Sequence, residues 1–264
     1  MTVKNVLFII DPQIDFHPGG ALGVPGAHED SQSIADFIRQ NTSQIDEIIV
    51  SLDSHHRIHI AHAVFWKNFK GEHPEPFTLI KHEDVLSGQW VPVDHSQLEY
   101  AKRYTKALED KGRFVVCIWP EHCLIGTQGH AVIPVLNDAL QEWVATRMTP
   151  VKYVHKGMNC LTEMYSALSA EVPLPDDPST ALNHALLEQL HTADRVIVCG
   201  EAKSHCVNYT MRDLAAHWNK DPSALILLNN CTSPVPGFED AALTFEAEMR
   251  KIGCVVTDHT NLVL

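Results

Sequence analysis

The sequence has few basic residues and no long apolar run. Lysine and arginine together number 20 against 33 acidic residues, which gives a formal net charge of -13. Binding to a phosphate backbone or an anionic lipid surface needs a basic patch, and this charge balance opposes one. No stretch reaches the roughly 20 apolar residues that span a bilayer. The composition therefore predicts neither a nucleic-acid partner nor a membrane partner.

We also expect neither a disulfide framework nor a secretory leader. The seven cysteines are scattered along the chain, without the short paired spacings of a zinc knuckle or a disulfide framework. The opening stretch MTVKNVLFII has an apolar run shorter than that of a secretion signal, and Asp11 follows it instead of a small-residue cleavage site. We therefore expect a cytoplasmic protein with reduced thiols.

What the sequence does contain is a series of short apolar runs. They cover residues 5–10, 47–52, 113–118, 151–154, 195–199, 224–228 and 254–257. The runs are continuous rather than alternating, which is typical of strands buried on both faces. Helical periodicity separates most of them, at 31–40, 96–110, 131–147, 180–191, 204–218 and 238–251. This order predicts an α/β fold of three layers, α/β/α, around a mainly parallel sheet of about six strands.

One segment interrupts the alternation. Residues 61–94 mix proline, glycine, histidine and aromatic residues without a clear period. Chains of this length often form one α/β domain. We expect a single domain over residues 1–264, with an insertion around 61–112 that covers or reshapes a pocket.

Chemically active side chains follow the apolar runs. In a parallel sheet, ligands bind beyond the carboxyl ends of the strands. The residues found just after the first five runs are Asp11, then Asp53 and His55, then Trp119 and His122, then Lys156, and finally Cys206 beyond Gly200. These side chains should gather at one edge of the sheet.

Cys206 is a candidate nucleophile. If Ser204 caps the following helix, Cys206 falls in its first turn, where free N–H groups and the helix dipole favour a thiolate. The N–H groups from Ala202 to Cys206 form a candidate oxyanion hole. Asp11 to accept the thiol proton and Lys156 to stabilise negative charge would complete a covalent hydrolase site. Taken singly, the three residues are also typical of a packed thiol, a turn carboxylate and a solvated lysine.

Histidine is abundant, with 17 copies, and several of them crowd into the stretch DSHHRIHIAH. Asp53 and His55 point the same way if the chain there is extended. His59 follows four residues later, and His122 lies beyond the third run. One carboxylate with two imidazoles suits zinc, manganese or iron. A solvated, histidine-rich loop is the alternative interpretation.

Five segments resemble, in order, the successive blocks of the isochorismatase-like cysteine hydrolases and, within that family, the nicotinamidase branch. The segments are LFIIDPQIDF, SLDSHHRIHI, IWPEHCLIGTQG, VHKG and GEAKSHCVNYT. The resemblance implies a catalytic triad of Asp11, Lys156 and Cys206. It also implies metal ligands at Asp53, His55 and His122, and His59 matches a histidine that only some members use as a ligand.

The same resemblance assigns further positions. Phe16 and Trp119 match the aromatic residues that sandwich a pyridine ring, with ordinary packing as the alternative. A cis peptide bond is expected between Glu201 and Ala202. Glu201 itself departs from the family, which usually has a small apolar residue there, and the segment 61–112 is longer than in compact relatives.

The sequence thus predicts a metal-dependent amidohydrolase that converts a small heteroaromatic carboxamide, such as nicotinamide, to the acid and ammonia through a thioester. Three alternatives stay open: a metal-free ureido or carbamoyl amide hydrolase, a vinyl ether hydrolase of the isochorismatase type, and a non-catalytic metal-binding or redox-sensing protein. The vinyl ether chemistry needs no thiol nucleophile, so Cys206 disfavours it. Homo-oligomers are common in the family, which makes self-association a further expectation.

Overall fold

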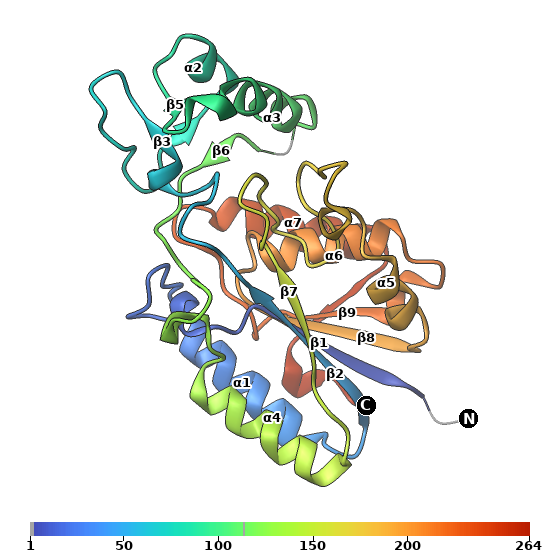
Figure 1. Cartoon of the computed structure of the whole chain (residues 1–264). Coiled ribbons are helices and arrows are strands. Elements are labelled where there is room, and N and C mark those ends of the chain that lie inside the picture. The colour runs from blue at the N-terminus through green and yellow to red at the C-terminus, as the bar shows by residue number, and fades with distance from the viewer. Residues whose placement is uncertain (1–2, 113) are drawn as a thin grey trace.

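A computed structural model describes residues 3–112 and 114–264 and has a parallel sheet of six strands at its centre (Figure 1). The strand order across the sheet is β10-β9-β8-β1-β2-β7. The strands are β1 (Asn5–Ile10), β2 (Ile45–Asp53), β7 (Lys152–Lys156), β8 (Arg195–Gly200), β9 (Leu225–Leu228) and β10 (Val255–Thr257). The predicted six-stranded parallel sheet is confirmed.

Helices cover both faces of this sheet (Figure 1). The helices are α1 (Ala27–Gln40) and α4 (Pro134–Arg147) on one face, and α5 (His184–His191), α6 (Cys206–Ala216) and α7 (Glu239–Lys251) on the other. Successive residues of β1 point to opposite faces. Leu7 therefore packs in the cluster with Ile34 and Trp143, while Phe8 packs in the cluster with Met211 and Phe245. The predicted three layers are confirmed.

The segment that breaks the strand-helix alternation has a hydrophobic cluster of its own. It contains β3 (Trp66–Lys67) paired with β5 (Val91–Pro92), β4 (Leu79–Ile80) paired with β6 (Val116–Cys117), and the helices α2 (His82–Leu86) and α3 (Leu98–Asp110). Phe65, Trp66 and Tyr104 are buried at its centre. Figure 1 shows this segment, hereafter the excursion, beyond one end of the sheet.

The prediction of a sheet strand at 113–118 is wrong. Arg113 lies outside the described residues, and Val116 and Cys117 pair with β4 of the excursion instead of with the central sheet. Val116 and Ile118 bury their side chains in the excursion cluster. The run is apolar because it completes that second core.

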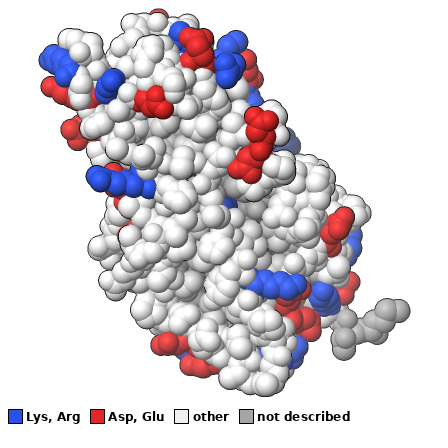
Figure 2. Space-filling view, in the orientation of Figure 1, with Lys and Arg blue, Asp and Glu red and all other residues white. Residues whose placement is uncertain are grey.

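Charged side chains are unevenly spread over the surface. In the face shown in Figure 2, Lys, Arg, Asp and Glu gather toward the two ends of the molecule, and the middle is largely free of them.

No helix among the described residues combines the length and the apolar character needed to cross a membrane.

Candidate active site

Asp11 stands directly after β1, with a φ of 44°. Residues other than glycine rarely adopt this conformation, and those that do cluster at functional sites. The Asp11 N–H donates to the Ser51 carbonyl at 3.1 Å, and the Ser51 hydroxyl donates to Asp11 Oδ1 at 2.6 Å. Ser51 and Asp53 lie on the same face of β2 because they are two residues apart. Ser51, which the sequence did not single out, therefore orients the Asp11 carboxylate.

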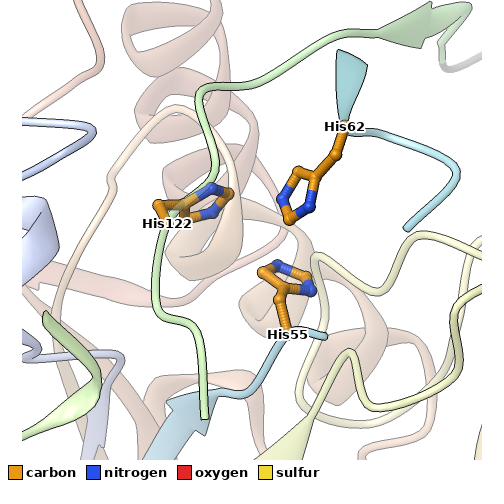
Figure 3. A group of neighbouring side chains, drawn as sticks. All are labelled: His55, His62 and His122. Carbon is orange, nitrogen blue, oxygen red and sulfur yellow. The ribbon is translucent and has the colours of Figure 1, made fainter. Parts of the chain in front are cut away.

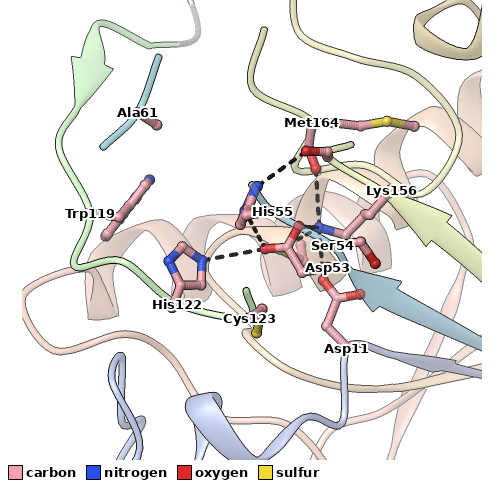
Figure 4. Close-up of polar contacts among 12 residues, drawn as sticks. Asp11, Asp53, Ser54, His55, Ala61, Trp119, His122, Cys123, Lys156 and Met164 are labelled. Carbon is pink, nitrogen blue, oxygen red and sulfur yellow. Dashed lines mark hydrogen bonds and ion pairs between the residues drawn. The ribbon is translucent and has the colours of Figure 1, made fainter. Parts of the chain in front are cut away.

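Lys156, at the end of β7, points toward Asp11 and Asp53 (Figure 4). Its Nζ lies 2.8 Å from Asp11 Oδ2, 3.4 Å from Cys206 Sγ and 3.1 Å from Asp53 Oδ1, and it donates to the Met164 carbonyl at 3.0 Å. Burial lowers the pKa of Lys156, but Asp11, Asp53 and Cys206 more than offset this and raise it well above its ordinary value. The structure therefore brings Asp11, Lys156 and Cys206 together around a charged ammonium.

Cys206 is the first residue of α6, so its predicted place in the first helical turn is confirmed. The predicted cap is wrong. His205 occupies the N-cap position, while the Ser204 hydroxyl accepts from the Val235 N–H at 3.0 Å and lies 2.9 Å from His205 Nδ1. The Ser204 hydroxyl therefore bonds to the loop before α7 and does not cap α6.

The surroundings of Cys206 oppose ionisation of its thiol. Burial raises the pKa of Cys206 well above its usual range, Lys156 opposes the rise, and Asp11 adds to it. The expectation that the helix start favours a thiolate is therefore wrong, because burial of the thiol outweighs it, with a further contribution from Asp11. Burial also raises the pKa of Asp11, with Lys156 opposing. The Cys206 proton thus has a nearby carboxyl group to receive it.

The loop before Cys206 has free N–H groups. The peptide bond between Glu201 and Ala202 is cis, as expected. The N–H groups of His205 and Val207 donate to the Ala202 carbonyl at 3.0 and 3.2 Å. In the part of the chain that the structure describes, the N–H groups of Ala202 and Cys206 make no hydrogen bond. They are available to an oxyanion.

Three histidines meet beside this centre (Figure 3). One ring nitrogen from each of His55, His62 and His122 lies within 4.8 Å of the others. Each Nδ1 lies against a backbone carbonyl: that of Gly157 at 3.2 Å for His55, Arg57 at 3.1 Å for His62 and Pro120 at 2.8 Å for His122. A carbonyl can only accept, so each Nδ1 carries a proton and each Nε2 can present its lone pair. This is the arrangement in which imidazoles bind a metal.

Asp53 completes the group. Its Oδ2 lies 3.0 Å from His55 Nε2 and 3.4 Å from His122 Nε2. Gln13 fixes the residue by donating to the Asp53 carbonyl and accepting from the Asp53 N–H, both at 2.7 Å. The structure thus brings the predicted Asp53, His55 and His122 together. Three imidazoles and one carboxylate fit zinc, manganese or iron.

His62 takes the place in this group that the sequence offered to His59. His59 Nδ1 accepts from the Ala61 N–H at 3.2 Å, and its Nε2 donates to the Thr162 carbonyl at 3.2 Å, so both nitrogens are engaged. The buried Nε2 of His62 has no partner among the described residues. Burial lowers the pKa of His62 to about 3, which keeps the ring neutral. The histidine-rich stretch was the only signal for His62, because the turn that aims it cannot be inferred from spacing.

A pocket opens beside Cys206. Its lining includes Phe16, Leu22, Asp53, Trp119, His122, Glu163, Tyr165, Ala202, His205, Cys206 and Val235. The Phe16 and His122 rings pack edge to face, with their centroids 5.5 Å apart. Trp119 Nε1 donates to the Tyr165 hydroxyl at 3.1 Å. The structure therefore places both predicted ring contacts on the pocket wall. Phe77 of the excursion packs against Trp119 at 5.9 Å, so the excursion supports this wall.

No protein-family model matches the chain. Two curated proteins are similar in sequence. The chain is 26% identical over 212 residues to the nicotinamidase of Escherichia coli K12, covering 79% of this chain and 75% of the relative. It is 27% identical over 207 residues to the nicotinamidase of Acinetobacter baylyi, covering 78% and 72%.

Solved structures share the fold. The nicotinamidase and pyrazinamidase of Acinetobacter baumanii matches with a TM-score of 0.66 at 21% identity over 98% of both chains. The yeast nicotinamidase matches with a TM-score of 0.66 at 23% identity, over 96% of this chain and 99% of the other. The pyrazinamidase of Pyrococcus horikoshii in complex with zinc matches with a TM-score of 0.60 at 18% identity, over 97% and 99%. By sequence the chain is similar to these two nicotinamidases, and it shares its fold with the solved nicotinamidases and pyrazinamidases.

Proposed function

We propose that the protein is a metal-dependent cysteine amidohydrolase that converts a small heteroaromatic carboxamide, such as nicotinamide, to the acid and ammonia. The observation that carries the proposal is the contact of Lys156 Nζ with Asp11 at 2.8 Å and with the Cys206 sulfur at 3.4 Å, beside the histidine cluster. The nicotinamidase relatives support the substrate class.

In the proposed reaction, Asp11 accepts the Cys206 proton and the thiolate attacks the amide carbon. The N–H groups of Ala202 and Cys206 hold the oxyanion that forms. Asp11 then returns the proton to the leaving ammonia, and a thioester remains. Water that gives a proton to Asp11 attacks the thioester, which releases the acid and restores the thiol. Lys156 stabilises the negative charge that alternates between Asp11 and the sulfur.

Asp53, His55, His62 and His122 would hold the metal, with zinc preferred and manganese or iron also suited to these donors. The metal would supply a Lewis acid that binds and orients the ring nitrogen of the substrate. The zinc complex of the Pyrococcus horikoshii pyrazinamidase supports this assignment. We place Phe16 and Trp119 against the faces of the substrate ring.

The excursion fits the same proposal. It contributes His62 to the cluster and Phe77 to the support of Trp119, so we assign it the role of shaping the pocket within one hydrolase domain. The seven cysteines are all free, which fits a reducing, cytoplasmic setting.

The test is an ammonia-release screen over nicotinamide, pyrazinamide, ureido compounds and larger aromatic amides, with and without chelator. We expect release from the pyridine or pyrazine amides, lost on chelation and regained with zinc. Chelator-resistant release from ureido compounds would favour the metal-free alternative. A redox sensor is disfavoured because sensor thiols are exposed and have low pKa values, whereas Cys206 is buried and its pKa is raised.

A further inference from the structure

The side chain of Glu201, one residue before the proposed oxyanion hole, turns away from the pocket. It is 1% exposed and faces Asp30 of α1, which is 6% exposed. The Ser233 N–H donates to Glu201 Oε2 at 3.4 Å. Among the described residues, Glu201 Oε1 and Asp30 Oδ2 are buried oxygens to which no donor is directed. Two carboxyl groups thus meet with one unsatisfied oxygen each.

Two buried carboxyl groups in contact cannot both be ionised at low cost, and one retained proton turns an acceptor into a donor. We propose that Asp30 and Glu201 share one proton, and that the hydrogen bond it makes is a positioning device that fixes the oxyanion loop, residues 201–206, to α1. The positioning role rests on the proposed function, whereas the shared proton does not.

In the described part of the chain, the cation that acts on both carboxyl groups is engaged by other partners. This cation, Lys203, is held by Glu246 at 3.1 Å and by the Asn229 carbonyl at 3.0 Å. Glu29 of α1 adds negative charge, and the thiols of Cys199 and Cys231 are neutral because burial raises the pKa of both. Burial, and after it Asp30, raises the pKa of Glu201 well above its ordinary value. The proton is therefore retained at neutral pH.

Among the described residues, the other hydrogen bonds of the loop backbone run to elements other than α1. The Glu201 N–H donates to the Ile10 carbonyl at 2.7 Å, and the Lys203 N–H donates to the Ser233 carbonyl at 2.8 Å. These bonds hold the loop to β1 and to the loop after β9. The contact with Asp30 links the loop to a third element, α1, and so further restricts the movement of the oxyanion hole. Two negative charges at this point would push the loop and α1 apart.

A conservative variant distinguishes the effect of the shared proton from the effect of side-chain size. Glu201→Gln keeps a donor for Asp30 but cannot ionise, whereas Glu201→Ala removes the donor. We expect kcat of Glu201→Ala to fall about tenfold to a hundredfold with KM little changed, as for a reacting group displaced by about 1 Å. Glu201→Gln should keep near wild-type kcat at neutral pH and retain it to a higher pH than the wild type. Equal losses in both variants would overturn the proposal.

A second measurement needs no substrate. At neutral pH, the infrared difference spectrum between wild type and Glu201→Gln should contain the C=O band of a buried, protonated carboxylic acid. Absence of that band overturns the proposal, whatever the activities and even if the alanine variant fails to fold. A band in a wild-type protein that hydrolyses no amide would support the shared proton and reject the proposed function alone.

Discussion

The ammonium of Lys156 lies 3.1 Å from Oδ1 of Asp53, the residue whose other carboxylate oxygen faces the histidine cluster. One carboxylate therefore belongs to both halves of the site. Burial raises the pKa of Asp53, but His55 and Lys156 more than offset this and lower it well below its ordinary value. The thiol centre and the candidate metal centre are electrostatically a single unit.

Asp53→Asn should consequently impair both the thiol centre and the candidate metal centre. We expect ammonia release to fall about a hundredfold or more, the size of an acid–base defect, and added zinc should not restore it. His122→Asn touches only the histidine side, so excess zinc should recover part of its activity. The measurement is ammonia release against zinc concentration, and full recovery of Asp53→Asn would show that the two centres are independent.

Replacing the nucleophile or its base tests the covalent mechanism. Cys206→Ala should abolish ammonia release because no thioester can form, and Asp11→Asn should lower kcat by about 10² to 10⁴. Cys254→Ala is the matched control, since Cys254 and Cys206 are both buried, each with 5% of its surface exposed, but Cys254 lies before β10, away from the site. Substantial turnover by Cys206→Ala would contradict the nucleophile assignment.

His62 and His59 form a matched pair for the metal site. Loss of groups that only support a ligand weakens metal binding about 10- to 100-fold, so His62→Ala should weaken it at least that much. His59→Gln should change it little, because both of its ring nitrogens bond to backbone. Zinc affinity is read by competition with a chromophoric chelator, independently of turnover. The reverse ranking would assign the ligand to His59.

His205 predicts a specific loss of stability in acid. Burial lowers its pKa from 6.5 to about 4, so the folded protein holds the neutral ring. As the pH falls, the unfolded chain binds this proton at a higher pH than the folded protein does. The free energy of unfolding should therefore decline as the pH falls from about 6.5 toward 4. In His205→Phe this part of the decline should disappear. Denaturant unfolding across that pH range provides the check, and identical profiles would contradict the assignment.

The excursion core should contribute strongly to stability. Trp66 is fully buried, and Phe69 is 84% exposed three residues later. Trp66→Ala should cost about 3–5 kcal/mol, whereas Phe69→Ala should stay within about 0.5 kcal/mol. Denaturant unfolding of both variants would measure these changes in the free energy of unfolding. A small effect at Trp66 would mean that the excursion unfolds without the rest.

Sequence patterns located most of the central sheet. Continuous apolar runs marked β1 and β8 because a strand covered on both faces has no polar side. The same pattern misplaced residues 113–118, since an apolar run indicates burial without identifying the partner. In the folded protein, this run completes the second core of the excursion.

The site was predictable where topology alone brings residues together. Asp11, Asp53 and Lys156 were found because parallel strands end at one edge. The partner of Glu201 was not predicted, because Asp30 is remote in sequence and an acidic residue is common in the first turn of a helix. The direction of the Cys206 pKa shift was also missed, since it depends chiefly on how deeply the fold buries the thiol.

The sheet has a second edge, at which every strand begins. The connections there, residues 41–44, 148–151 and 192–194, supply none of the groups discussed above. Chemistry and scaffold thus occupy opposite poles of the molecule. A dye or an affinity handle grafted into one of these connections would anchor the protein to a support with its reactive pole turned toward the solution.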